Sequence, residues 1–165
     1  MDREVSTWFS DVLRHSVRLV TYHESNVRVR NPEILQLPIE VSYADGYPYL
    51  ILGTASLADL NSRLQEPVEM NRFRPNIVVR TSIPFEEDEW NQKLVGNNPM
   101  QIVKPCARCI MTTINQTNLQ RGKEPLYALS KYRQVGKNIL FGVNAIALEE
   151  GGIMKVGDKI APYEA

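Results

Sequence analysis

The stretch "MQIVKPCARCIMTTIN", Met100 to Asn115, contains two runs rich in aliphatic and β-branched residues, together with both cysteines of the chain. The runs at 100–105 and 109–115 are each typical of a β-strand. Similar runs occur at 17–22, 49–53, 76–81, 142–149 and 155–163. Many short strands with few helices predict a mostly β fold, a barrel or sandwich with a few peripheral helices.

Helical patterns occur on both sides of the first internal strands. Apolar residues recur at helical spacing between Val5 and Leu13, which predicts a short amphipathic helix. Ser56 followed three residues later by Asp59 is a capping-box pattern, and it predicts a two-turn helix over 57–64.

The remaining segments are expected to be a third helix and loops. Pro125 in a first helical turn predicts a helix over 124–134. The segment from about 26 to 47 contains two prolines and little periodicity, so it is expected to be a loop. The acidic run 84–90 is expected to form a solvated turn, and Arg133 a structural contact.

Length and charge limit the class of protein. A chain of 165 residues is long enough for one domain with a substantial core. The chain has 19 Lys or Arg residues and 19 Asp or Glu residues, so its formal net charge is zero. A protein that binds nucleic acid is typically basic, so this balance argues against that class. The first residues lack the pattern of a leader peptide, and no segment has the roughly 20 apolar residues of a membrane span. With two cysteines, we expect a cytoplasmic protein with reduced thiols.

The C-x-x-C pair, Cys106 and Cys109, has several interpretations. A zinc site needs three or four protein ligands, and the histidines, His15 and His23, lie far upstream and do not form a ligand pair. Dithiol redox chemistry needs a helix after the motif, which the β-branched residues there disfavour. Two interpretations stay open: two small core residues, or a single thiolate that ligates a metal held mainly by an organic cofactor.

Charge near the cysteines favours the thiolate. Lys104 precedes the pair and Arg108 lies within it, and cationic neighbours stabilise a thiolate. A second polar group, Arg72, Arg74 and Asn76, occupies alternate positions of "NRFRPN". In an extended segment these three side chains share one face, which suits phosphate or a polar heterocycle. The alternative is a solvated strand face with Asn76 in a turn. Asp45, in "YADGYP", is by itself a turn former.

Several stretches in order resemble the MOSC domain, and more narrowly the branch of mitochondrial amidoxime-reducing components and their bacterial relatives. The stretches are "YADGYPYLILGTASLADLNSRL", "NRFRPNIVV", "FEEDEW", "CARCIMTTIN", "KEPLYALSKYRQ", "LFGVNAIAL" and "MKVGD". The similarity extends from about 42 to 162, which leaves 1–41 as a remnant of an N-terminal β-rich region and the whole chain as one MOSC domain. It implies a MOSC-type β-barrel.

The resemblance also implies a cofactor and its site. Members of the family bind molybdenum cofactor, and pyridoxal phosphate binding is a further family-level possibility. By the same resemblance Cys109 is the thiolate bound to molybdenum and the catalytic residue, and Cys106 lies nearby without ligating. The implied cofactor-binding residues are Asp45, Arg72, Arg74, Asn76, Ala107 and Arg108. Ala107 occupies a position at which relatives can carry serine, so that contact falls to the backbone.

The implied activity is reduction of the N–O bond of small N-hydroxylated compounds, with the cofactor supplying the redox chemistry. Larger members of the family begin with a further N-terminal section that contacts the cofactor phosphate, and some bacterial relatives carry a ferredoxin-like domain. Neither pattern occurs here, so we expect electrons from a separate flavin-, haem- or iron–sulfur-type reductase. The sequence also allows a fragment of a longer protein, a non-catalytic cofactor or sulfur carrier, or a degenerate fold.

Overall fold

The computed structural model describes residues 3–21, 23, 28–32, 34, 38–44 and 46–163. The chain divides into two compact units, Met1–Ala44 and Asp45–Ala165. The prediction of a single domain over 1–165 stays a prediction. The second unit contains all the candidate site residues, of which Asp45 lies outside the described residues.

The first unit contains a helix and a short hairpin. Helix α1, Arg3–Leu13, confirms the predicted amphipathic helix, and its apolar side chains are exposed. Strands β1, Arg28–Arg30, and β2, Ile39–Val41, pair antiparallel. The predicted loop over 26–47 is therefore wrong at these strands. The strand predicted over 17–22 is also wrong for 17–21, because these residues have no regular structure and pair with no described strand, and Tyr22 lies outside the described residues.

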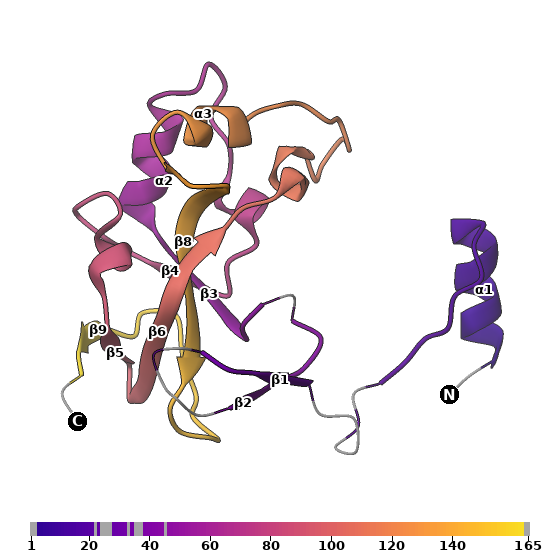
Figure 1. Ribbon diagram of the computed structural model, residues 1–165, viewed down its shortest axis with the longest axis horizontal. Helices are drawn as coiled ribbons and strands as arrows, with labels where there is room; N and C mark the ends of the chain where they lie inside the picture. The colour runs from indigo at the N-terminus through magenta and orange to yellow at the C-terminus, as the bar shows by residue number, and fades with distance from the viewer. Residues whose placement is uncertain are drawn as a thin grey trace. The chain divides into compact units, whose positions relative to one another are not determined.

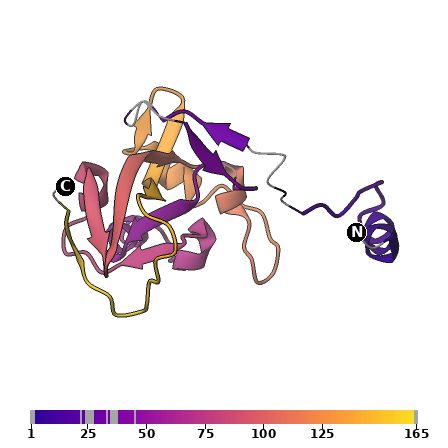
Figure 2. The ribbon, with the colours of Figure 1, turned by 90° about the horizontal axis from the view of Figure 1, so that it is seen from below.

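The second unit is built on a seven-stranded sheet, counted over the described residues, with the order β4-β3-β8-β6-β5-β9 and β7 beside β8. Its members are β3 Tyr49–Gly53, β4 Ile77–Val79, β5 Gln92–Val95, β6 Asn98–Ala107, β7 Gln134–Val135, β8 Asn138–Ala147 and β9 Ile160–Pro162. The long strands β6 and β8 cross the middle of this unit (Figures 1 and 2). This nearly closed barrel confirms the predicted fold class.

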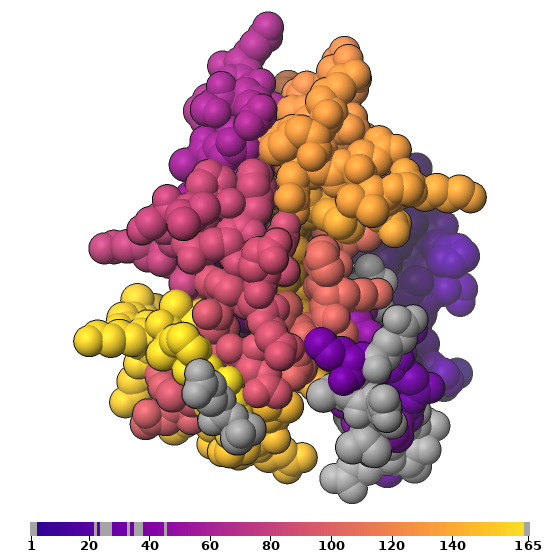
Figure 3. Space-filling view, turned by 60° about the vertical axis from the view of Figure 1, so that its left-hand side comes forward, coloured from indigo at the N-terminus to yellow at the C-terminus, as the bar shows by residue number. Residues whose placement is uncertain are grey.

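Apolar residues of the strands and helices build two separate core clusters. Ile51 and Leu52 are both fully buried and adjacent in β3, yet they belong to different clusters. This follows from the alternation of side chains across a strand. The Ile51 cluster lies among β3, β6 and β8, while the Leu52 cluster packs Phe73 and Phe141 beneath the helices, with ring centroids 4.5 Å apart. The C-terminal strand β9 pairs with β5 at the end of the sheet. Figure 3 shows the C-terminal segment, in yellow, on the surface of this unit.

The helices of the second unit are shorter or displaced from their predicted bounds. Helix α2, Thr54–Asn61, begins three residues before the predicted start, with Gly53 as its N-cap. The capping box was therefore wrong, because the Ser56 hydroxyl is buried inside the helix and donates to the Glu87 carboxylate at 2.7 and 2.8 Å. Helix α3 is limited to Leu126–Ser130 within the predicted 124–134.

The acidic run 84–90 is also not a purely solvated turn. It contains the 3-10 helix η3, Glu86–Glu89, in which Glu87 is fully buried. The Glu87 carboxylate accepts the Gly53 N–H at 3.0 Å in addition to the Ser56 hydroxyl, so it anchors the first turn of α2. Arg133 pairs with Asp88 of the same run, which confirms its structural role.

The strand predicted at 109–115 is wrong. Residues Ile110–Thr113 form a 3-10 turn, η4. The Thr112 hydroxyl donates to the Cys109 carbonyl at 3.0 Å and the Thr113 hydroxyl to the Ile110 carbonyl at 2.8 Å. These local bonds satisfy carbonyls that a strand would have offered to a neighbouring strand. None of the helices in the described part of the chain is long and apolar enough to cross a membrane.

Candidate functional site

The C-x-R-C segment lies where β6 ends and η4 begins. Cys106 is the penultimate residue of β6 and partly buried, whereas Cys109 precedes η4 and is exposed. Both thiols are free. Cys109 has extended backbone geometry, with φ −113° and ψ 177°, and its carbonyl accepts the Thr112 N–H at 3.2 Å. The turn therefore fixes the backbone of Cys109 while leaving its sulfur accessible to a ligand.

Arg108 connects this segment to two other parts of the unit. Its guanidinium donates to the Cys106 Sγ at 3.2 Å and to the Phe73 carbonyl at 2.8 Å, and it lies 5.5 Å from the centroid of the Phe73 ring. Its backbone N–H donates to the Ile139 carbonyl at 2.7 Å. One further donor, Nε, is buried and has no hydrogen-bond partner among the described residues. Arg108 thus fixes the cysteine segment against η2 and β8. Its Nε–H stays available to an acceptor on a ligand.

The "RFRPN" segment does not have the extended form that the sequence suggested. Met70–Phe73 form the 3-10 helix η2, and Arg74 ends it in the left-handed region with φ 54°. Alternate residues therefore do not share a strand face. Arg72 is partly buried and Arg74 exposed.

Asn76 closes this segment onto the sheet. Its backbone N–H donates to the Leu50 carbonyl at 2.9 Å, and its Oδ1 accepts the Leu50 N–H at 2.9 Å. The side-chain carbonyl is therefore used in the structure of the protein. Within the described residues, the amide nitrogen of Asn76 donates to none of its neighbours, so that nitrogen can serve a ligand.

The two turns that carry Arg74 and Cys109 pack together. Turn η2 contacts η4, and the Gln116 side chain donates to the Asn71 carbonyl at 2.9 Å. Ala107 is exposed at the end of β6. The structure thus brings the cysteine and arginine motifs to one place. It leaves the predicted roles of Arg72, Arg74, Asn76, Ala107, Arg108 and Cys109 as predictions, and the role of Asp45 outside what it describes.

Protein side chains alone do not build a metal cage in the described part of the chain. No three His, Cys, Asp or Glu side chains gather there in a way that could hold an ion. A metal bound at Cys109 would therefore take its other ligands from a cofactor.

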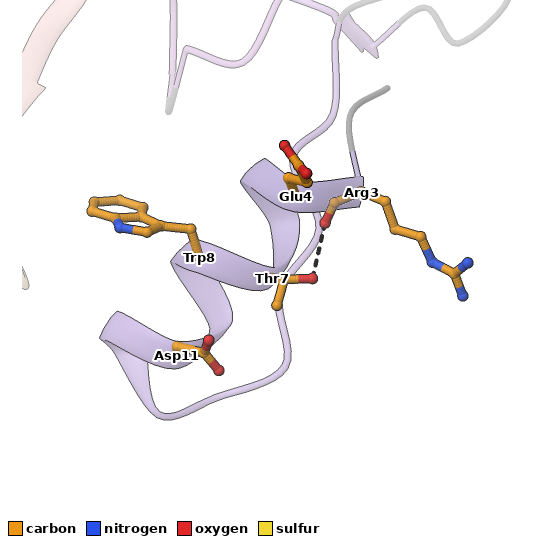
Figure 4. Close-up of a pocket in the computed structure, with 5 residues that line it drawn as sticks. All are labelled: Arg3, Glu4, Thr7, Trp8 and Asp11. Atoms are coloured by element: carbon orange, nitrogen blue, oxygen red, sulfur yellow. Dashed lines mark hydrogen bonds between the residues drawn. The ribbon is translucent and has the colours of Figure 1, made fainter.

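Other polar groups lie away from this site and have structural roles. Arg63 donates to Asp59 at 3.0 and 2.9 Å, and this bond holds the pKa of Asp59 below its usual value. Burial raises the pKa of Tyr132 to about 12, and the Arg63 guanidinium lies 4.2 Å from the centre of its ring. Among the described residues, a hollow on the first unit is lined by α1 alone, from Arg3 to Asp11, and no second described element encloses it (Figure 4).

Sequence reasoning missed the contacts that fix the cysteine segment. The Phe73 carbonyl and the Gln116 amide join distant turns. Neither contact has a local sequence signature, because both depend on how η2 and η4 pack. Arg108 was identified through its charge, and the geometry gives it a positioning contact in addition.

Replacing Arg108 by alanine is expected to lower the free energy of unfolding by about 1.5–3 kcal/mol, the range for hydrogen bonds from a charged donor. Arg108→Lys should recover part of this loss, since one ammonium cannot reproduce the two-pronged contact. Urea unfolding measures both variants, with the exposed Arg80→Ala as the matched control. A loss below about 0.5 kcal/mol for Arg108→Ala, the range of surface substitutions, would show that these bonds do not hold the segment.

The comparisons with known proteins agree with the resemblance found in the sequence. The family model of the MOSC domain matches residues 38–161. Human mitochondrial amidoxime-reducing component 1 is 37% identical over 166 residues, which cover 93% of this chain and 49% of that protein. Mitochondrial amidoxime reducing component 2 of Bos taurus is 40% identical over 170 residues, 95% of this chain and 50% of that protein. Molybdenum cofactor sulfurase of Oryza sativa subsp. japonica is 31% identical over 159 residues, 86% of this chain and 19% of that protein.

The matched relatives differ from this chain in length, and their names bear on its location. The chain spans about half the length of the amidoxime-reducing relatives it matches. The names of those relatives contradict the cytoplasmic location expected from the sequence, because both are mitochondrial. The low cysteine count indicated only reduced thiols, and such thiols are not specific to one compartment. The family model covers most of the chain, and the chain belongs to the MOSC domain family.

Proposed function

We propose that this chain binds molybdenum cofactor through the Cys109 thiolate and reduces small N-hydroxylated compounds with electrons from a separate donor protein. The observation that carries the proposal is the exposed Cys109 at the end of β6, on a turn packed against the "RFRPN" turn. The family and its amidoxime-reducing relatives support the same assignment. Their names also support a mitochondrial location.

The residues of the site fit this cofactor. Molybdenum cofactor is an anionic pterin with a dithiolene and a terminal phosphate, and it needs cations, amide donors and one thiolate. Arg74 is exposed beside the turn that holds Cys109, and the Asn76 amide nitrogen is available. The buried Nε of Arg108 has no partner in the part of the chain that the structure describes. A buried N–H without an acceptor costs about 1–3 kcal/mol, so an anionic ligand that accepts it would add stability.

Each residue has a distinct task in the proposed site. Cys109 supplies the protein's one sulfur ligand. Arg74 and Arg72 offset the negative charge of the cofactor, and Asn76 donates to its heterocycle. Arg108 holds the ligand-bearing segment in place through Cys106 and Phe73. Ala107 contributes through its backbone, and a cofactor-binding role for Asp45, which lies outside the described residues, is proposed from the family resemblance alone.

When bound, the cofactor would supply the two-electron chemistry for reduction of the N–O bond. The overall change consumes two electrons and two protons: an N–OH group becomes N–H and the oxygen leaves as water. The chain's own residues orient the substrate and keep the cofactor in place. The electrons come from a separate carrier of the flavin, haem or iron–sulfur type.

The activity is tested with purified protein reconstituted with molybdenum cofactor. We expect anaerobic oxidation of a reduced flavin donor to accelerate at least tenfold when benzamidoxime is added, with formation of benzamidine. Cys109→Ser treated in the same way is the blank. Equal rates in the two proteins would show that the chain does not reduce amidoximes, even if it retains metal.

A second function, a non-catalytic carrier of cofactor or sulfur, has one observation in its favour. The chain is 31% identical to a molybdenum cofactor sulfurase over most of its length. The carrier would retain molybdenum through Cys109 but fail the amidoxime assay. The two proposals therefore separate in the same experiment.

A further inference from the structure

Charge is distributed unevenly along this chain. Residues 98–147, from the start of β6 to the end of β8, contain seven Lys or Arg and one Asp or Glu, a surplus of six positive charges. The rest of the chain has the opposite surplus, because the totals are 19 of each sign. A chain of zero net charge thus has one strongly basic segment, and that segment includes Cys109.

Most of these cations are exposed to solvent. Arg108 and Arg133 are held inside by the contacts described above. The other five are exposed, and none forms an ion pair within the residues that the structure describes: Lys104, Arg121, Lys123, Lys131 and Lys137. Glu124, whose carboxylate accepts the Ala128 N–H at 2.9 Å, is the one anion of the segment and forms no ion pair with these cations within the described residues. The positive charge of this segment is therefore available to a partner.

Three of the cations lie close to the turn that follows Cys109. The Gly122 N–H donates to the Thr113 carbonyl at 3.2 Å, and Ile114 pairs with Arg121 across an isolated bridge. Turn η4 contacts α3, and Figure 1 shows the two at the same end of the unit. The Tyr127 ring of α3 has the Lys123 Nζ at 5.1 Å and the Lys131 Nζ at 4.3 Å from its centroid.

The same region exposes large apolar side chains. Ile110 is 71% exposed, Met111 60% and Leu119 74%, and Tyr127 is 47% exposed. Ile110 and Met111 come directly after Cys109 and are held by the turn in which Thr112 and Thr113 are buried. Apolar side chains ringed by charge are typical of a protein interface, in which the apolar part is buried and the charged rim steers the approach.

We propose that these residues form a docking face for an acidic electron-carrier protein. The docking face consists of Ile110, Met111, Leu119, Arg121, Lys123, Tyr127 and Lys131. The identity of the partner as an electron carrier rests on the proposed function, since a donor must come close to the metal ligand and Ile110 is the neighbour of Cys109. The acidity of the partner follows from charge complementarity alone.

A protein partner fits better than nucleic acid or a membrane surface. Outside the basic segment the chain has a surplus of negative charge, which would repel a long polyanion or an extended anionic bilayer. A compact acidic protein can contact the basic region without approaching the negatively charged remainder of the chain. The exposed apolar residues of the same region also need apolar surface to cover them, which a phosphate backbone does not supply.

The test is binding of an acidic plant-type ferredoxin to the apoprotein, measured by calorimetry at low and at high salt. We expect binding that weakens as salt increases, and no binding of a basic c-type cytochrome. Lys123→Glu with Lys131→Glu should weaken ferredoxin binding at least tenfold. Lys155→Glu with Lys159→Glu, an exposed pair in the C-terminal segment, is the control for net charge and should weaken it less than threefold.

The apolar part of the face is tested in the same way. Ile110→Ser with Met111→Ser should weaken binding at least fivefold without changing its salt dependence. Ile153→Ser with Val156→Ser, at residues that are more exposed than the test pair, should not weaken it. The apoprotein removes any dependence on metal retention or turnover, so failure of the proposed function would not change the result.

Three results would overturn the proposal. One is absence of ferredoxin binding by the wild-type chain at low salt. Another is an equal effect of the two lysine pairs, which would show that only total charge matters. The third is tighter binding of a single-stranded oligonucleotide or of phosphatidylserine vesicles through the same lysines, which would assign the face to a different polyanion.

Discussion

Cys109→Ser is expected to remove at least nine-tenths of the molybdenum that the wild-type protein retains after reconstitution and gel filtration. A serine hydroxyl is a harder and much less acidic donor than a thiol, so it does not replace a thiolate as a ligand to this metal. Because Cys109 is exposed, the substitution should leave the free energy of unfolding within about 0.5 kcal/mol of the wild type. Elemental analysis of molybdenum per protein, with urea unfolding of the apoproteins, measures both quantities.

Cys106→Ser is the matched control. It lies three residues away and accepts a hydrogen bond from Arg108 through its sulfur. A serine oxygen can accept the same bond, so most of the molybdenum should remain. If both variants lose the metal equally, the two thiols act as a shared dithiol site and the single-thiolate proposal is wrong.

Glu87→Ala should cause the largest loss of stability among these substitutions, about 2–4 kcal/mol. The carboxylate is fully buried and accepts the Gly53 N–H and the Ser56 hydroxyl. Its removal leaves two buried donors without an acceptor and opens a cavity. The first turn of α2 would lose its anchor. Urea unfolding gives the free energy, and circular dichroism shows whether the variant still folds at low denaturant.

Two neighbouring variants make this prediction specific. Glu87→Gln keeps the size of the side chain and one carbonyl oxygen, so its loss should fall between that of Glu87→Ala and zero. Glu89→Ala removes an exposed carboxylate from the same turn and should change stability by less than about 0.5 kcal/mol. If Glu89→Ala lowers the free energy of unfolding as much as Glu87→Ala does, the stabilisation comes from the negative charge of the turn and not from the buried contacts of Glu87.

The sheet could be predicted from the sequence because its strands carry local patterns. The runs at 49–53 and 142–149 are bounded by breakers and rich in β-formers, and both became strands. Residues 109–115 have a similar composition but form a turn, because the hydroxyls of Thr112 and Thr113 bond to nearby carbonyls. Composition does not distinguish a threonine that faces a neighbouring strand from one that bonds to its own backbone.

The candidate site was accessible to sequence reasoning only through its motifs. Cys109 was selected through the resemblance to the MOSC domain, since the residues alone left open two core cysteines or a single thiolate, and Arg108 was noted for its charge. The buried contacts were not accessible. Glu87 was expected in a solvated turn, since an acidic run is usually exposed, and only the packing of η3 against α2 shows where its carboxylate goes. Arg74 was expected on a strand, and its left-handed backbone has no signature in "RFRPN".

The two hydrogen bonds between Asn76 and Leu50 affect the entropy cost of binding a ligand at the Arg74 turn. The side-chain amide and the backbone of Asn76 both hydrogen-bond to the backbone of Leu50 in β3. These two bonds fix the chain just after Arg74. On its other side, the Arg74 N–H is held by the Asn71 carbonyl at 3.0 Å. A non-glycine residue in the left-handed region carries about 1–3 kcal/mol of strain, and here that cost falls on folding. The backbone of Arg74 is therefore preorganised before a cofactor binds at this turn, so less conformational entropy would be lost on binding.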